Sequence, residues 1–138
     1  MVHRILGERP ALEVIRGSGL RCKWLVQTFS HLPGDADEAT ISRYAKAYLL
    51  YLIGAVLFVD KTNNQIQLLY LTLLDDTWER IGEYSWGSAA LGYLYRRLCG
   101  AAQKNVKEIA GPIVILQMLC TVRGGILHAG RASTPTAV

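Results

Sequence analysis

An uncharged run of thirteen residues, "AYLLYLIGAVLFV" at 47–59, constrains the fold of this chain more than any other segment. It lies between Lys46 and Asp60 and is well short of the roughly 20 apolar residues that a membrane-spanning helix requires. The sequence therefore predicts a helix buried in a protein core and no membrane span.

The residues before this run predict where its helix begins. Asp35 and Glu38 have the spacing of a capping box, with Asp35 as the N-cap. Apolar residues then recur at helical spacing, which predicts one continuous buried face. That face comprises Ile41, Tyr44, Ala45, Tyr48, Leu49, Leu52, Ile53 and Val56.

Helical patterns also predict most of the remaining elements. A short helix through Trp24–Phe29 is expected to end before Pro33 and Gly34, which favour a turn. Segment 66–76 is leucine-rich and too short for periodicity to separate a helix from a buried strand. We assign it as a helix, because it contains few β-branched residues and its neighbours are helical.

A longer helix is predicted to start at Ser85, a suitable N-cap, and to run through "WGSAALGYLYRR". Gly87 and Gly92 each cost roughly 1 kcal/mol relative to alanine inside a helix. We therefore expect another element to approach this helix closely at the two glycines, with Trp86 in a helix–helix contact.

The last predicted helix covers residues 112–120, starts at Pro112 and is apolar nearly all round. Residues 121–138 contain glycines and a proline without periodicity, which indicates a disordered tail. The sequence as a whole predicts an all-α fold, an irregular multi-helix bundle over residues 1–120 with a disordered C-terminal tail over residues 121–138.

Composition and cysteine spacing narrow the class of protein. Hydrophobic residues make up 51% of the chain and charged residues 19%, as in globular proteins. Three cysteines lie far apart without CxxC spacing, which argues against a disulfide framework or a zinc site. The N-terminus lacks the pattern of a secretory signal peptide.

Positive charge is concentrated in the C-terminal third, since residues 91–138 hold six Lys/Arg and one Glu. Tyr93 and Tyr95 lie nearby and could stack on bases, although tyrosines at helical spacing are common in cores. The competing interpretation is a solvated face at a helix end. The candidate nucleic-acid contacts are Arg96, Arg97, Lys104 and Lys107.

Catalytic patterns are weak in this sequence. His3, His31 and His128 are isolated, and neither a phosphate-binding loop nor a GxSxG motif is present. A hydrolase using Asp75, Asp76 or Glu83 is an alternative, but acidic residues with this spacing, Glu79 included, are typical of a helix start. We predict no enzyme activity, no cofactor, no metal and no small-molecule substrate.

Five blocks together resemble the plant mobile domain, a family also labelled aminotransferase-like and found in MAIN-like and transposon-encoded plant proteins. The resemblance covers roughly residues 5–119, and its "YSWGSA" block is quite specific. The blocks are "ERP" at 8–10, "GLRCKWL" at 19–25, "RYAKAYLLYLIGAVLFVDK" at 43–61, "IGEYSWGSAALGYLYRRLC" at 81–99 and "GPIVILQML" at 111–119.

The resemblance implies an all-helical, nuclear protein linked to transposable elements, gene silencing, genome stability and meristem maintenance. It implies no catalytic residues, and nothing in the sequence marks a lysine for pyridoxal phosphate. Some family members carry a fused phosphatase, whose metal motifs are absent from this sequence. In this interpretation the scaffold includes Trp24, Tyr48, Leu52, Trp86 and Tyr93.

Both ends of the sequence depart from the family pattern, so we expect a truncated or partial copy. The helix at 112–120 would then expose apolar surface that favours self-association or partner binding. The favoured interpretation is a non-enzymatic module that binds nucleic acid or chromatin proteins. The alternatives are a protein-interaction or self-association module, a degenerate fragment without independent function, and the hydrolase.

Overall fold

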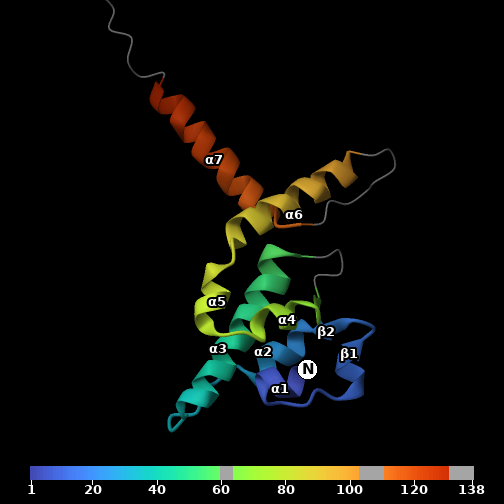
Figure 1. The fold of residues 1–138 in the computed structure, drawn as a ribbon. Helices are drawn as coiled ribbons and strands as arrows, with labels where there is room; N and C mark the ends of the chain where they lie inside the picture. Colours follow the sequence, from blue (N-terminus) through green and yellow to red (C-terminus); the bar gives the residue numbers. More distant parts are fainter. Residues whose placement is uncertain (60–63, 103–110, 131–138) are drawn as a thin grey trace, which may run out of the picture.

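The computed structural model describes residues 1–59, 64–102 and 111–130 (Figure 1). Helices predominate in this part of the chain, as predicted, but a small antiparallel sheet means that the fold is not strictly all-α. The elements are α1 (Val2–Leu6), η1 (Leu12–Val14), β1 (Ile15–Arg16), β2 (Gly19–Arg21), α2 (Cys22–Thr28), α3 (Glu38–Leu52), η2 (Ile53–Leu57), β3 (Gln65–Gln67), α4 (Tyr70–Leu74), α5 (Trp78–Glu83), α6 (Trp86–Ala101) and α7 (Ile113–Gly130).

The sheet has the strand order β1-β2-β3. Strands β1 and β2 form a hairpin, and Gly17 in its loop has a φ of 59°, which glycine adopts without strain. Strand β3 adds to the other edge of β2, where Leu20 pairs with Ile66. The helix assigned over 66–76 is therefore wrong at its start, because β2 offers hydrogen bonds to Gln65–Gln67 and helix α4 begins only at Tyr70.

Helix α3 begins two residues later than predicted. Asp37, not Asp35, is the N-cap, and its carboxylate accepts a hydrogen bond from the Thr40 backbone N–H at 3.0 Å. The helix continues into a single π-helical turn, η2, which ends at Leu57.

The buried face of α3 also differs from the predicted one. Ala47 and Leu50 are buried, whereas Ile41 and Tyr48 are exposed, so the interpretation of Tyr48 as scaffold is wrong. The physical reason is that the helix is apolar on nearly every side after Lys46. Periodicity then cannot select the face that the neighbouring elements cover.

Gly54 in η2 allows strand β3 to pack directly against the end of this long helix. A Cβ atom built on Gly54 would lie only 2.8 Å from Cγ1 and 2.9 Å from Cβ of Ile66. Ile66 is itself fully buried, so its side chain has no free space into which to move. A glycine is required at this contact.

One hydrophobic core joins α1, β2, α2, α3, β3, α4 and α5, and we call this part of the chain, residues 1–83, the body. The members from α1 and the sheet meet those from α3 and α4 at its centre. The buried core residues are Val2, Ile5, Leu6, Leu20, Leu25, Ala47, Leu50, Ile53, Ile66, Leu71, Leu74 and Ile81.

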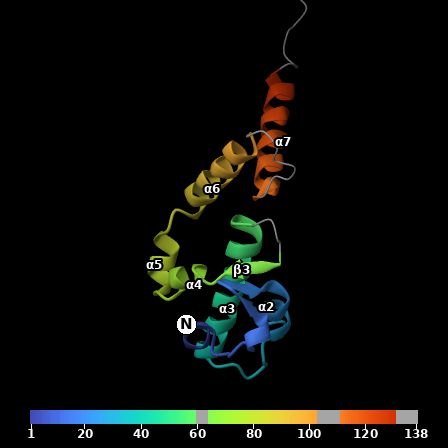
Figure 2. The same cartoon turned by 90° about the vertical axis from the view of Figure 1, so that its right-hand side faces the viewer.

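Helices α6 and α7 extend away from the body in both views, and we call them the arm (Figures 1 and 2). Hydrogen bonds and a ring contact of Trp86 and Tyr93 help attach α6 to the body. The Trp86 indole donates to the Ile81 carbonyl at 3.0 Å, the Tyr93 hydroxyl donates to the Val59 carbonyl at 3.0 Å, and the Tyr93 ring lies edge-on to Phe58.

Helix α6 begins after Ser85, as predicted, and buries Ala90 and Leu94. The expectation of a close approach at Gly87 and Gly92 is wrong, because a Cβ at either position would meet no atom within 4 Å. Trp86 packs against the body core, with its ring also edge-on to Tyr84.

Helix α7 begins directly after Pro112, as predicted, and continues to Gly130, past the expected end at Cys120. Residues 131–138 of the predicted tail lie outside the described residues. Within the described ranges, no helix is both long enough and apolar enough to cross a membrane.

Candidate interaction site

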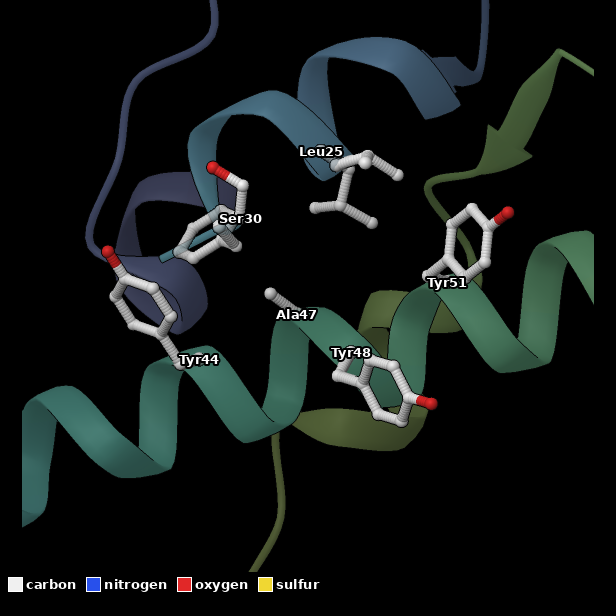
Figure 3. Close-up of a pocket in the computed structure, with 8 residues that line it drawn as sticks. Leu25, Ser30, Tyr44, Ala47, Tyr48 and Tyr51 are labelled. Atoms are coloured by element: carbon white, nitrogen blue, oxygen red, sulfur yellow. The ribbon is translucent and has the colours of Figure 1, made fainter. Parts of the chain in front are cut away.

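A groove lies between helix α2 and the middle of helix α3 (Figure 3). Its volume is about 330 Å³. The lining is apolar and aromatic, and no lining side chain is charged. The residues that form it are Leu25, Val26, Phe29, Ser30, Tyr44, Ala47, Tyr48 and Tyr51.

The helical spacing of α3 places the tyrosines along one wall. Tyr44, Tyr48 and Tyr51 follow the i, i+4, i+7 pattern, and Figure 3 shows them in a row along α3. Ala47 lies between them and is buried together with Leu25 from α2. Tyr44 and Tyr51 are half-buried, whereas Tyr48 is exposed.

Aromatic contacts hold the end of the groove beside Phe29. The rings of Phe29 and Tyr44 meet edge-to-face with centroids 5.1 Å apart, and Trp24 lies edge-on to Phe29 at 6.3 Å. Such pairs are worth about 0.5–1.5 kcal/mol beyond their buried area. Phe29 and Tyr44 are therefore fixed, whereas Tyr48 is 65% exposed.

The polar edge of the groove lies at the end of α2. The Ser30 hydroxyl donates to the Gln27 carbonyl at 3.1 Å, and Nδ1 of His31 lies 3.0 Å from the same hydroxyl. A concave apolar surface with a few polar groups at its edge is the usual form of a binding site for an apolar ligand or peptide segment.

The predicted basic contacts are only partly placed. Arg96 is exposed on α6, and Lys104 and Lys107 lie outside the described residues. Arg97 is half-buried, donates to the Tyr93 hydroxyl at 2.6 Å and stacks over the Tyr93 ring at 4.8 Å. The Tyr93 hydroxyl also donates to the Val59 carbonyl, so Tyr93 contributes to the attachment of the arm, and Arg97 contacts Tyr93 from the next turn of the same helix.

The acidic residues Asp75, Asp76, Glu79 and Glu83 do not form one group, because they make separate contacts or are exposed. Asp75 forms an ion pair with Arg4, and Asp76 lies 3.4 Å from Arg80 one helical turn away. Glu79 and Glu83 are exposed on α5. Among the described residues, no group of three or more His, Cys, Asp or Glu side chains could hold a metal ion.

The groove was missed at the level of sequence because two of its tyrosines, Tyr44 and Tyr48, were assigned to the buried face of the helix. The available signal was the spacing of Tyr44, Tyr48 and Tyr51, since three hydroxyl groups on one face are poorly suited to a dry core. Phe29 could not have been added, because its contact with Tyr44 depends on how α2 folds back onto α3.

Comparison with known protein families identifies this architecture. The sequence matches the family model described as plant mobile domain over residues 1–132. The chain belongs to the plant mobile domain family. The match covers the body and both helices of the arm, so α7 is part of the plant mobile domain. No solved structure matches the chain.

Several curated proteins of Arabidopsis thaliana are similar to this plant mobile domain. It is 39% identical over 127 residues to Serine/threonine-protein phosphatase 7 long form homolog, an alignment that covers 92% of this chain and 9% of that protein. It is 39% identical to Protein MAIN-LIKE 2 over 114 residues, covering 83% of this chain and 17% of the relative.

A third relative is Protein MAINTENANCE OF MERISTEMS, which is 37% identical over 114 residues, covering 83% of this chain and 23% of that protein. The chain therefore spans less than a quarter of each of these relatives. It corresponds to part of a longer protein in each case.

Proposed function

We propose that this plant mobile domain acts by binding and not by catalysis, and that the groove between α2 and α3 receives an apolar segment of a partner protein. The observation that carries this proposal is a groove wall formed by the exposed Tyr48 and the half-buried Tyr44 and Tyr51, beside the buried Leu25 and Ala47. Aromatic side chains of this kind supply much of the binding energy at protein interfaces.

The charges around the candidate residues support binding over hydrolysis. Of the carboxylates considered for a hydrolase, Asp75 and Asp76 are paired with Arg4 and Arg80, and Glu83 is exposed on α5. The groove itself has no charged lining side chain, so it is suited to an apolar segment and poorly suited to a phosphate group.

The similarity to named relatives extends the proposal to a cellular setting. A relative called MAINTENANCE OF MERISTEMS suggests a part in meristem maintenance. We place the protein in the nucleus, as a transposon-derived module that serves gene silencing by contacting chromatin proteins.

Peptide selection tests the proposed groove. Peptides selected from a random library on the whole chain should carry apolar anchors, and their binding should be measured by fluorescence polarisation. Tyr48→Ala should weaken binding about tenfold, the effect of an interface residue worth about 1.4 kcal/mol. Tyr95→Ala is the matched control, because Tyr95 is 72% exposed on α6 and lies outside the groove.

A second variant tests the groove as the binding site without changing Tyr48. Val26→Asp places a charge on the opposite wall of the groove, at an exposed position where little effect on folding is expected. Selected peptides that bind this variant and Tyr48→Ala as tightly as the original chain would show that the groove is not the binding site.

A further inference from the structure

Helix α7 exposes a stripe of apolar residues that no other described part of the chain covers. Val114, Met118 and Val122 follow one another at intervals of four residues and are 56%, 64% and 62% exposed. None of the described side chains on α7 is buried, and the helix points away from the body in both views (Figures 1 and 2).

This stripe carries no charge, because residues 111–122 contain no Asp, Glu, Lys or Arg. Two copies of the same surface can therefore meet without repulsion between like charges. A charged partner would gain no electrostatic contact here, so the charge pattern favours a partner whose surface is equally neutral and apolar.

The stripe is also symmetric about its centre, since Val114 and Val122 lie at equal distances from Met118. When two such helices run antiparallel around a two-fold axis at Met118, the position of Val114 faces that of Val122 in the second copy, and Met118 faces Met118. The surface is therefore complementary to itself, as an interface with two-fold symmetry requires.

We propose that two copies of this chain associate through α7, packed antiparallel along Val114, Met118 and Val122. Antiparallel packing also opposes the two helix dipoles favourably. One helix face from each copy is smaller than the roughly 1,000 Å² or more of a stable interface. The dimer is therefore weak, and its population depends on protein concentration.

Sedimentation equilibrium at several concentrations tests the association. The chain should pass from monomer to dimer as concentration rises, and Met118→Glu should remain a monomer throughout. Tyr95→Glu is the matched control, because it places the same charge at an exposed aromatic position on α6, and it should still dimerise. A chain that stays monomeric at every concentration would overturn the proposal.

Disulfide crosslinking tests the register and direction. The background is Cys99→Ser with Cys120→Ser, since both cysteines are exposed, whereas burial raises the pKa of the half-buried Cys22 thiol and lowers its reactivity. Met118→Cys should crosslink to itself under mild oxidation. Val114→Cys should not, because its two copies would lie roughly 12 Å apart along the helices.

Mixing the two end variants completes the test. Val114→Cys and Val122→Cys should crosslink to each other when mixed, and self-crosslinking of Val114→Cys would show parallel packing and contradict the proposal. Binding of groove-selected peptides to Met118→Glu should be unchanged. The dimer and the proposed function of the groove can therefore fail separately.

Discussion

Helices α3 and α7 both contain long uncharged apolar segments, but the chain covers them very differently. Ala47 and Leu50 of α3 and Ile53 of η2 are buried, where α1, α2 and α4 contact α3 and strand β3 contacts η2. The described side chains of α7 up to Val122 are exposed or half-exposed. Apolar composition therefore predicts a helix in both places, whereas burial depends on which neighbours the topology brings to it.

The body also shows how this coverage is achieved in a short chain. Strand β3 returns from the end of η2 to the edge of β2, and its Ile66 reaches the core through the space left by Gly54. By contrast, Gly87 and Gly92 on α6 face open space. We therefore expect the body to be much more sensitive to substitution than the arm.

The largest difference in stability between the body and the arm is expected when a large side chain is removed in each region. Leu71→Ala in the body should lower the free energy of unfolding by about 2–5 kcal/mol, because it leaves a cavity in a fully buried site. Met118→Ala on α7 should change it by less than about 0.5 kcal/mol. Urea unfolding of dilute protein measures both values, and equal losses would contradict the division into body and arm.

Glycine-to-alanine substitutions should change the free energy of unfolding in opposite directions in the body and in the arm. Gly54→Ala should destabilise the chain by about 1–3 kcal/mol, since the added methyl group overlaps Ile66 in a packed core. Gly92→Ala should stabilise the open helix α6 by roughly 0.5–1 kcal/mol. The measurement is again urea unfolding. If Gly54→Ala were also stabilising, the contact between η2 and β3 would be wrong.

Removal of the Tyr93 hydroxyl group tests how the arm is attached to the body. Tyr93→Phe removes the donor to the Val59 carbonyl and the acceptor for Arg97, and should cost about 0.5–1.5 kcal/mol. Hydrogen exchange in α6 should become faster in this variant. Tyr95→Phe is the control, because Tyr95 is exposed on the same helix, and it should leave both quantities unchanged.

The smallest effect concerns the N-cap of α3 and its dependence on pH. Hydrogen bonds from the Thr40 side chain and backbone N–H hold the pKa of the Asp37 carboxyl below its usual value. Folding is therefore stabilised by the ionised carboxylate above the unfolded pKa of about 3.9, and this contribution is lost as pH falls through the lower folded pKa.

Asp37→Asn isolates this contribution, because asparagine caps the helix without titrating. Thermal unfolding monitored by circular dichroism should show a slightly smaller loss of stability between pH 5 and pH 2 for the variant, about the range over which a paired carboxylate protonates. Asp35→Asn should follow the original chain. If Asp35→Asn, and not Asp37→Asn, showed the smaller loss of stability at low pH, Asp35 would be the N-cap.

Much of the helical framework was predictable, because local signals determine it. Ser85 and Pro112 mark the starts of α6 and α7, and the run after Lys46 is helical as expected. The N-cap was predicted two residues too early, since Asp35 and Asp37 both have side chains suited to capping. Strand β3 could not be predicted from Gln65–Gln67, because its partner, β2, lies more than forty residues earlier.

The candidate site was less predictable for the same physical reason. The groove requires Leu25 and Phe29 of α2 to fold onto Ala47 and Tyr44 of α3, and these contacts are not encoded in either segment alone. Arg97 was grouped with other cations by sequence proximity, but its side chain donates to the hydroxyl of Tyr93, the residue that bonds α6 to Val59.

The central claim is that the body has a buried core, whereas the described residues leave the apolar face of α7 uncovered. Hydrogen exchange monitored by mass spectrometry at a low and a high protein concentration tests it most directly. Amides of α3 and β2 should be strongly protected at both concentrations, while those of α7 should exchange rapidly in dilute protein and more slowly in concentrated protein. Protection of α7 equal to that of α3 in dilute protein would contradict the claim.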